Sequence, residues 1–117
     1  MANRHYENAV KHGFYEDYNR VRALLTEPKD IMFFNQIWHS HRLMLIVSEL
    51  SEGLEAIRNN NYDVMPRTGG LGEELADTRI RLEDFFEHLY PSETFDAVVD
   101  EKADYNESRP YKHNRSL

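Results

Sequence analysis

Residues 43–58, LMLIVSELSEGLEAIR, decide the fold, because apolar side chains recur through them at helical spacing. They return at alternating steps of four and three residues, at Leu43, Val47, Leu50, Leu54 and Ile57. This spacing places them along one side of an α-helix and is typical of the seam between helices in a bundle. We therefore predict one long helix over residues 31–59, with this stripe facing its neighbours.

Breaks in the sequence separate the long helix from the segments around it. Residues 14–26 carry apolar side chains at helical spacing and are expected to form a shorter helix. Pro28 interrupts that helix, and Asp30 is the expected N-cap of the long one. Residues 59–71 contain three consecutive asparagines, a proline and two adjacent glycines, which predict a loop.

The second half of the chain is expected to contain two more helices. Residues 71–89 have an apolar face, made of Leu71, Leu75, Leu82, Phe85, Phe86 and Leu89. Residues 93–107 are expected to form the last helix, with Ser92 as its N-cap and Pro110 beyond its end. No segment alternates apolar and polar residues with a period of two, so we predict an all-α fold, a helical bundle of about four helices.

Length and charge limit the classes of function. A chain of 117 residues makes one domain; we expect an arm over residues 1–13, a helical domain over 14–109 and a basic tail over 110–117. A net charge of −7 disfavours nonspecific nucleic-acid binding, which needs a basic surface. Cysteine is absent, which excludes disulfides and thiolate metal sites. The longest apolar run, residues 43–47, is too short to cross a bilayer, and the polar N-terminus is unlike a secretion signal. We expect a cytoplasmic protein without a membrane partner.

Two acidic pairs flank the apolar faces of adjacent predicted helices. Glu49 and Glu52 lie three residues apart on the long helix, and Glu74 and Asp77 lie three apart on the next. At about 100° per residue, each pair lies on the same side of its apolar face, with nearly the same offset. Four carboxylates together would repel one another unless a cation lay among them, and a hard cation such as Mg²⁺ prefers oxygen ligands. The alternative is a solvated helix surface, on which glutamate is common.

These pairs and their surroundings resemble the MazG-like, all-α nucleoside triphosphate pyrophosphohydrolases. That family's signature is Glu-x-x-Glu on one helix and, after a loop, Glu-x-x-Asp on the next. Residues 43–58 resemble the family's first metal-binding helix, and residues 73–85, EELADTRIRLEDF, resemble its second. Within the second, Arg81 is spaced to pair with Asp77 or Asp84 on its own helix. The similarity covers about residues 37–113.

The sequence departs from the family pattern at two places. Ser48 stands where many members have a further glutamate just before the first acidic pair. Near the C-terminus, residues 102–113, KADYNESRPYKH, resemble the closing phrase of the smaller members, but His113 is followed by Asn114 and Arg115 rather than by Gly-Lys. The first departure removes an outer carboxylate, and the second weakens the case for a phosphate contact by the extreme tail.

The resemblance implies hydrolysis of a (deoxy)nucleoside triphosphate to the monophosphate and pyrophosphate by a metal-activated water. Mg²⁺, with Mn²⁺ as an alternative, would be held by Glu49, Glu52, Glu74 and Asp77. Glu52 is the candidate general base, with Glu55 and Glu73 left open beside it. The family habit is a homodimer or homotetramer. Two alternatives remain: the same site acting on a dUTP-like or phosphoribosyl-ATP-like substrate, and a non-catalytic helical assembly module.

Four further residues are candidates for contact with the substrate. Lys102, Asn106 and Arg109 share one face of the last predicted helix and can bind phosphate or sugar; the alternative is a solvated basic turn. Trp38 lies about three turns before Glu49 at a similar angle around the helix. Its ring can stack on a base, or it can pack in the core or an interface.

Overall fold

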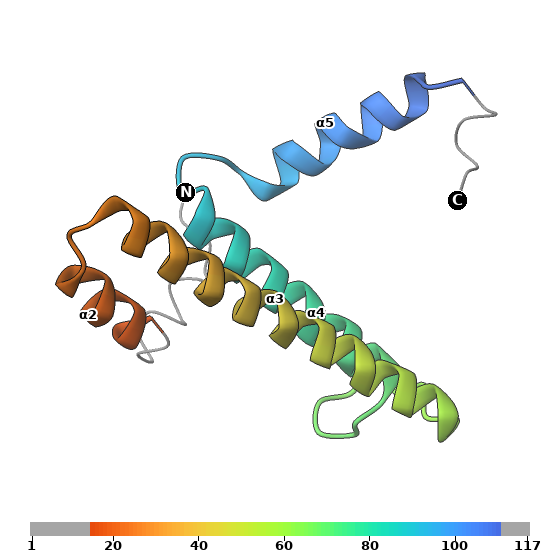
Figure 1. Ribbon diagram of the computed structural model, residues 1–117. Coiled ribbons are helices and arrows are strands. Elements are labelled where there is room, and N and C mark those ends of the chain that lie inside the picture. The colour runs from red at the N-terminus through yellow and green to blue at the C-terminus, as the bar shows by residue number, and fades with distance from the viewer. Residues whose placement is uncertain (1–14, 111–117) are drawn as a thin grey trace.

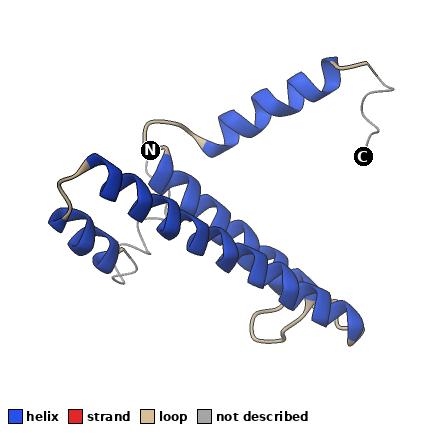
Figure 2. Ribbon diagram, in the orientation of Figure 1, coloured by secondary structure: helices blue, strands red, loops and turns tan. Residues whose placement is uncertain are grey.

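The structure, a computed structural model, describes residues 15–110, and within this range it contains four α-helices and no strand (Figures 1 and 2). The helices are α2 (Glu16–Leu24), α3 (Pro28–Arg58), α4 (Leu71–Leu89) and α5 (Phe95–Ser108). The prediction of an all-α fold with four helices is confirmed. The expected arm, residues 1–13, and residues 111–117 of the expected tail lie outside the described residues. None of the described helices combines the length and apolar character needed to cross a membrane.

An antiparallel pair of helices, α3 and α4, forms the body of the molecule (Figure 1). Small side chains let the two backbones approach, because Gly53 and Ala56 of α3 and Thr78 of α4 are all buried. A Cβ atom built at Gly53 would lie 3.3 Å from Leu71 Cδ1, so this glycine accommodates the closest approach. The Thr78 hydroxyl donates to the Glu74 carbonyl at 2.8 Å, which satisfies it within its own helix. The contact face is therefore narrow, and small residues define it.

The predicted seam of α3 is not its buried face. Leu43, Val47, Leu50, Leu54 and Ile57 remain between 43% and 53% exposed. The helix is instead turned so that Ile46, Gly53 and Ala56 face α4, because small residues permit a closer contact than the leucines would. The prediction that the stripe packs within the chain is wrong. It forms, with Met44, an exposed apolar surface that we call the α3 stripe.

Two helices begin at residues other than those predicted. α3 starts at Pro28, two residues before Asp30, because proline lacks only an N–H that the first helical turn leaves unpaired anyway. Asp30 lies in the first turn rather than at the N-cap. α5 starts at Phe95 with Thr94 at the N-cap position, rather than after Ser92, and no side chain caps its first turn.

Aromatic rings join α2 to the α3–α4 pair at the end remote from the α3–α4 loop (Figure 1). Tyr15 stacks on His88 with ring centroids 4.8 Å apart, and Tyr18 lies 4.5 Å from Trp38. The Tyr18 hydroxyl donates to Asn35 Oδ1 at 2.8 Å. We call Tyr15, Tyr18, Trp38 and His88 the aromatic cluster; it fixes the short helix to the pair.

α5 leaves the body of the molecule from the same end (Figure 1). Phe95 at its start stacks on Phe86 of α4, with ring centroids 4.6 Å apart. Beyond that contact the helix extends away from the pair, and none of its residues is buried. Its polar face is therefore not held against the other residues that the structure describes.

Candidate metal centre

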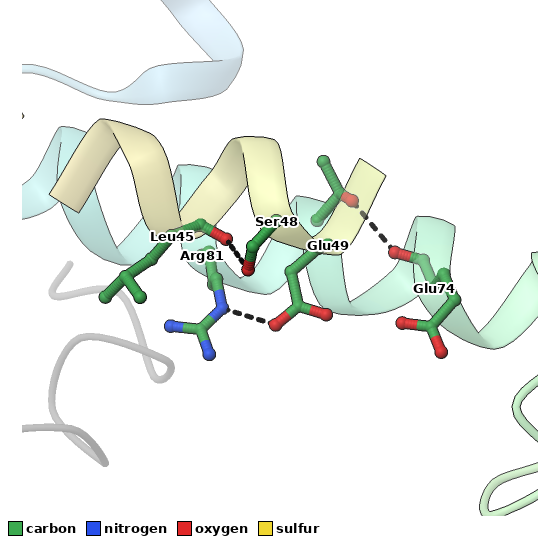
Figure 3. Close-up of polar contacts among 6 residues, drawn as sticks. Leu45, Ser48, Glu49, Glu74 and Arg81 are labelled. Carbon is green, nitrogen blue, oxygen red and sulfur yellow. Dashed lines mark hydrogen bonds and ion pairs between the residues drawn. The ribbon is translucent and has the colours of Figure 1, made fainter. Parts of the chain in front are cut away.

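Three carboxylates converge where α3 and α4 face each other. One oxygen from each of Glu49, Glu74 and Asp77 lies within 4.8 Å of the others. Glu74 is only 8% exposed, although it is a charged residue type. The side chains of Glu49 and Glu74 lie on the same side of the helix pair (Figure 3). The structure thus brings together three of the four acids predicted from sequence, and we call them the carboxylate cluster.

Glu52, the fourth predicted acid, lies at the edge of this cluster. It is exposed and is not among the three converging carboxylates. Its charge nevertheless raises the pKa of both Glu74 and Asp77, so it lies within electrostatic reach of them. Turning α3 to bury Gly53 and Ala56 places Glu49 toward α4 and leaves Glu52 on the flank.

The cluster is electrostatically costly when it is fully ionised. Burial raises the pKa of the Glu74 carboxyl, and the charges of Glu52, Asp77 and Glu49, with a hydrogen bond to Glu49, raise it further. Burial also raises the pKa of Asp77, with added repulsion from Glu49, Glu73 and Glu52 and an opposing effect of Arg81. A bound cation would relieve both causes, because it favours the ionised forms.

Arg81 connects the two helices at this cluster. Its Nε donates to Glu49 Oε2 at 2.7 Å (Figure 3). The spacing in the sequence indicated Asp77 or Asp84 on its own helix as partners, whereas the ion pair in the structure joins Arg81 to Glu49 of α3. Ser48 contributes nothing to the cluster, since its hydroxyl donates to the Leu45 carbonyl at 2.9 Å. Arg81 therefore orients Glu49 and offsets part of the negative charge.

A groove of about 750 Å³ adjoins the cluster, between α3 and the loop that follows it. Its polar lining includes Ser51 and Glu52 from α3, Asn59, Asn61 and Gly69 from the loop, and Glu74 in the first turn of α4. Glu52 and Glu74 thus border both the groove and the cluster. A ligand in this groove would have one end beside the carboxylates.

The other two candidate bases have structural partners. Glu55 pairs with Arg58 one turn along α3, at 3.1 Å. The Glu73 carboxylate accepts hydrogen bonds from the backbone N–H groups of Arg67 and Gly69, which lower its pKa. The spacing in the sequence alone did not show whether Glu73 or Glu52 is the better candidate for the general base. The signal that could have done so is an acidic residue in the first turn of a helix directly after a Gly-Gly loop.

The four candidate substrate residues lie away from the cluster within one chain. Trp38 belongs to the aromatic cluster, where the Arg42 guanidinium lies 4.4 Å from its ring centroid. Lys102, Asn106 and Arg109 are exposed on or just after α5, which extends away from the pair (Figure 1). The Lys102 ammonium lies over the Tyr105 ring, 4.7 Å from its centroid. None of these four side chains borders the groove.

Comparison with protein-family models, with curated proteins and with solved structures finds no match to this chain. The likeness to the MazG-like enzymes accordingly rests on the sequence motifs quoted above.

Proposed function

We propose that this protein is a Mg²⁺-dependent (deoxy)nucleoside triphosphate pyrophosphohydrolase of the MazG-like kind, acting in the cytoplasm. The observation that carries the proposal is the convergence of Glu49, Glu74 and Asp77 from two helices to within 4.8 Å. Three carboxylates are an oxygen-only donor set, which suits a hard divalent cation such as Mg²⁺ or Mn²⁺. The raised pKa of the buried Glu74 supports this, because its ionised form needs a positive neighbour.

The residues divide into three roles. Glu49, Glu74 and Asp77 would hold the cation, which when bound neutralises phosphate charge and acidifies a water molecule. Glu52, beside Glu74 on the groove, is the candidate general base, since the competing acids at 55 and 73 have the partners described above. Its carboxylate would take a proton from the attacking water as the water oxygen bonds to phosphorus and the α–β bridging P–O bond breaks. The products are the monophosphate and pyrophosphate.

The proposal includes a homodimer, or a homotetramer made of two such dimers. Among the described residues only Tyr15, Ile46 and Ala56 are buried apolar residues, which is a small core for four helices. The α3 stripe and three residues of α5, Val98, Val99 and Tyr105, remain exposed in one chain. A second copy packed on Leu43, Leu50 and Ile57, the part of the stripe that does not line the groove, would cover much of this surface. It would also offer a second α5, whose Lys102 and Asn106 could then approach the groove.

One alternative keeps the site and changes the substrate, to a dUTP-like or phosphoribosyl-ATP-like nucleotide. The other is a non-catalytic helical assembly module, and the exposed α3 stripe is the observation that favours it. In that case the carboxylate cluster would be a surface feature, and Mg²⁺ would have no effect on the protein.

The decisive experiment is a panel of nucleoside triphosphates and related nucleotides, assayed for pyrophosphate with and without Mg²⁺. We expect release from wild type that requires the metal and is abolished in Glu74→Ala. The matched control is Glu87→Gln, which removes a charge further along α4. A folded protein without turnover on any nucleotide, whose melting temperature ignores Mg²⁺, would favour the assembly module.

A further inference from the structure

The loop between α3 and α4 is fastened to α4 by one carboxylate. Glu73 Oε2 accepts the Arg67 N–H and Glu73 Oε1 accepts the Gly69 N–H, each at 2.7 Å. Both oxygens of this side chain are thus used within the loop. Neither of its hydrogen bonds involves the carboxylate cluster.

Further contacts fix the remainder of the loop. The Asn61 side-chain amide donates to the Thr68 carbonyl at 2.9 Å, and Asn61 Oδ1 accepts the Asp63 N–H at 3.2 Å. Arg67 and Gly69 have positive φ angles of 70° and 68°. Glycine adopts this conformation readily, whereas a residue such as Arg67 rarely does so without contacts that hold it there. At Arg67 the bond to Glu73 is such a contact. Residues 61–70 therefore form a folded loop rather than a loose connection.

This loop is one wall of the groove. Asn61 and Gly69 line it opposite α3, and Glu52 and Glu74 border the same groove beside the cluster. If the phosphates of a nucleotide lie beside Glu52 and Glu74, its nucleoside can extend from them toward this loop. On that side the lining combines the amide groups of Asn59 and Asn61 with the apolar side chain of Leu54 and with the paired Glu55 and Arg58. Hydrogen-bonding groups beside apolar surface suit a base and sugar.

We infer that Glu73 is a positioning residue: it holds loop 61–70 as the wall of the groove that selects the nucleoside part of a triphosphate. This inference rests on the proposed function for the class of ligand. Glu73 itself neither binds the metal nor takes the proton. It acts through the backbone of the loop, so its removal changes affinity and selectivity for the nucleotide rather than for the cation.

The test compares wild type, Glu73→Gln and the control Glu87→Gln by calorimetry. Each is titrated with Mg²⁺ alone, and then with a panel of α,β-imido nucleoside triphosphates, which resist cleavage, at saturating Mg²⁺. Glutamine keeps the size of Glu73 but offers one acceptor oxygen, so one of the two loop bonds is lost. We expect about tenfold weaker binding of the preferred nucleotide, with preference among nucleosides reduced to about threefold or less. The Mg²⁺ affinity should stay within about threefold of wild type.

The outcomes separate this inference from the proposed function. Nucleotide affinities in Glu73→Gln equal to those of wild type would overturn the inference, as would a loss of Mg²⁺ binding like that of Glu74→Ala. Absence of nucleotide binding by wild type would overturn it too. Glu73-dependent selectivity in a wild type that releases no pyrophosphate would uphold the inference and refute the proposed activity. Asn61→Ala loosens the loop from its other end and should reproduce the loss, with melting temperature and helical signal showing that each variant folds.

Discussion

The carboxylate cluster and the aromatic cluster lie on the same pair of helices, and each contains a titratable group whose pKa burial shifts toward the neutral form. Burial raises the pKa of Glu74, whereas burial lowers the pKa of His88 to about 4. Their neighbours differ in kind. His88 lies among aromatic rings, and the charges of His39 and Arg42 add to the lowering of its pKa, whereas Glu74 lies among carboxylates whose charges add to the raising of its pKa. In both groups burial is the first cause of the pKa shift, and only at Glu74 do the neighbouring charges have the sign that a bound cation would offset.

The largest effect should follow from removing the central carboxylate. Glu74→Gln keeps the size of the side chain and removes its charge, so we expect pyrophosphate release to fall by a factor on the order of 10³. The melting temperature without metal should stay equal or rise, because the costly ionised group is gone. The increase in melting temperature caused by Mg²⁺ should disappear. If Glu74→Gln kept both its turnover and its stabilisation by Mg²⁺, the carboxylate cluster would not be the metal site, and the proposed difference from the aromatic cluster would be lost.

A substitution in the aromatic cluster should lower stability and leave activity nearly unchanged, the opposite of the result expected for Glu74→Gln. Trp38→Ala removes a ring packed against Tyr15, Tyr18 and His88, and we expect a loss of about 2 kcal/mol in the free energy of unfolding, less than for a fully buried tryptophan. The kcat/KM of the folded protein should change by less than about threefold. Chemical denaturation and steady-state kinetics measure the two quantities. A large increase in KM with unchanged stability would instead support stacking of Trp38 on the substrate base.

A smaller effect should follow from Arg81, which supports the carboxylate cluster from its edge. Arg81→Gln removes the ion pair to Glu49, and we expect the Mg²⁺ affinity to fall by about tenfold. The comparison variant is Arg79→Gln, which removes an exposed guanidinium paired with Glu83 on the same helix and should leave Mg²⁺ affinity unchanged. Tighter Mg²⁺ binding in Arg81→Gln would mean that the guanidinium competes with the cation instead of orienting its ligand.

The sequence predicted the helices well because helix formation depends on local patterns. Prolines, asparagines and glycines placed the breaks within a few residues, and the acidic pairs identified the part of α3 and α4 where three carboxylates meet. The rotation of α3 was not predictable from its apolar stripe, because Leu50 and Leu54 outweigh Gly53 and Ala56 in any hydrophobic pattern. Close approach of backbones at small residues decides the contact, and a linear sequence carries little sign of it.

That rotation also explains which parts of the site the sequence could not supply. It turns Glu49 toward α4 and leaves Glu52 on the flank, although the two have the same spacing as Glu74 and Asp77. The Arg81–Glu49 pair depends on the same rotation, because it forms only when Glu49 faces α4. The two residues are 32 positions apart in the chain, so local spacing does not predict the pair. The attachment of the loop by Glu73 depends on the positions of two backbone N–H groups, and the acidic residue after Gly69 and Gly70 was its only sign in the sequence.

The smallest expected effect is a difference between the two clusters in how they change the free energy of unfolding with pH, without added metal. A carboxyl whose pKa is raised in the folded state binds its proton more tightly there. Glu74 and Asp77 therefore stabilise the fold at low pH, and this contribution is lost as the pH rises above their ordinary values of 4.5 and 3.8. For His88 the folded-state pKa is depressed, so its contribution is present above 6.5 and is lost as the pH falls from 6.5 toward about 4.

Between pH 7 and pH 5 the two clusters should thus change stability in opposite directions. Replacing the histidine by an apolar residue, His88→Leu, should remove the loss on acidification, an effect of order 1 kcal/mol once the partial exposure of the ring is allowed for. Mg²⁺ should stabilise the protein more at pH 7 than at pH 5, because protons compete with the cation for Glu74 and Asp77. Denaturation curves of wild type and His88→Leu at the two pH values, with and without Mg²⁺, measure these changes in the free energy of unfolding. A Mg²⁺ effect that does not grow with pH would show that the cation acts elsewhere than on Glu74 and Asp77, whose pKa values burial raises.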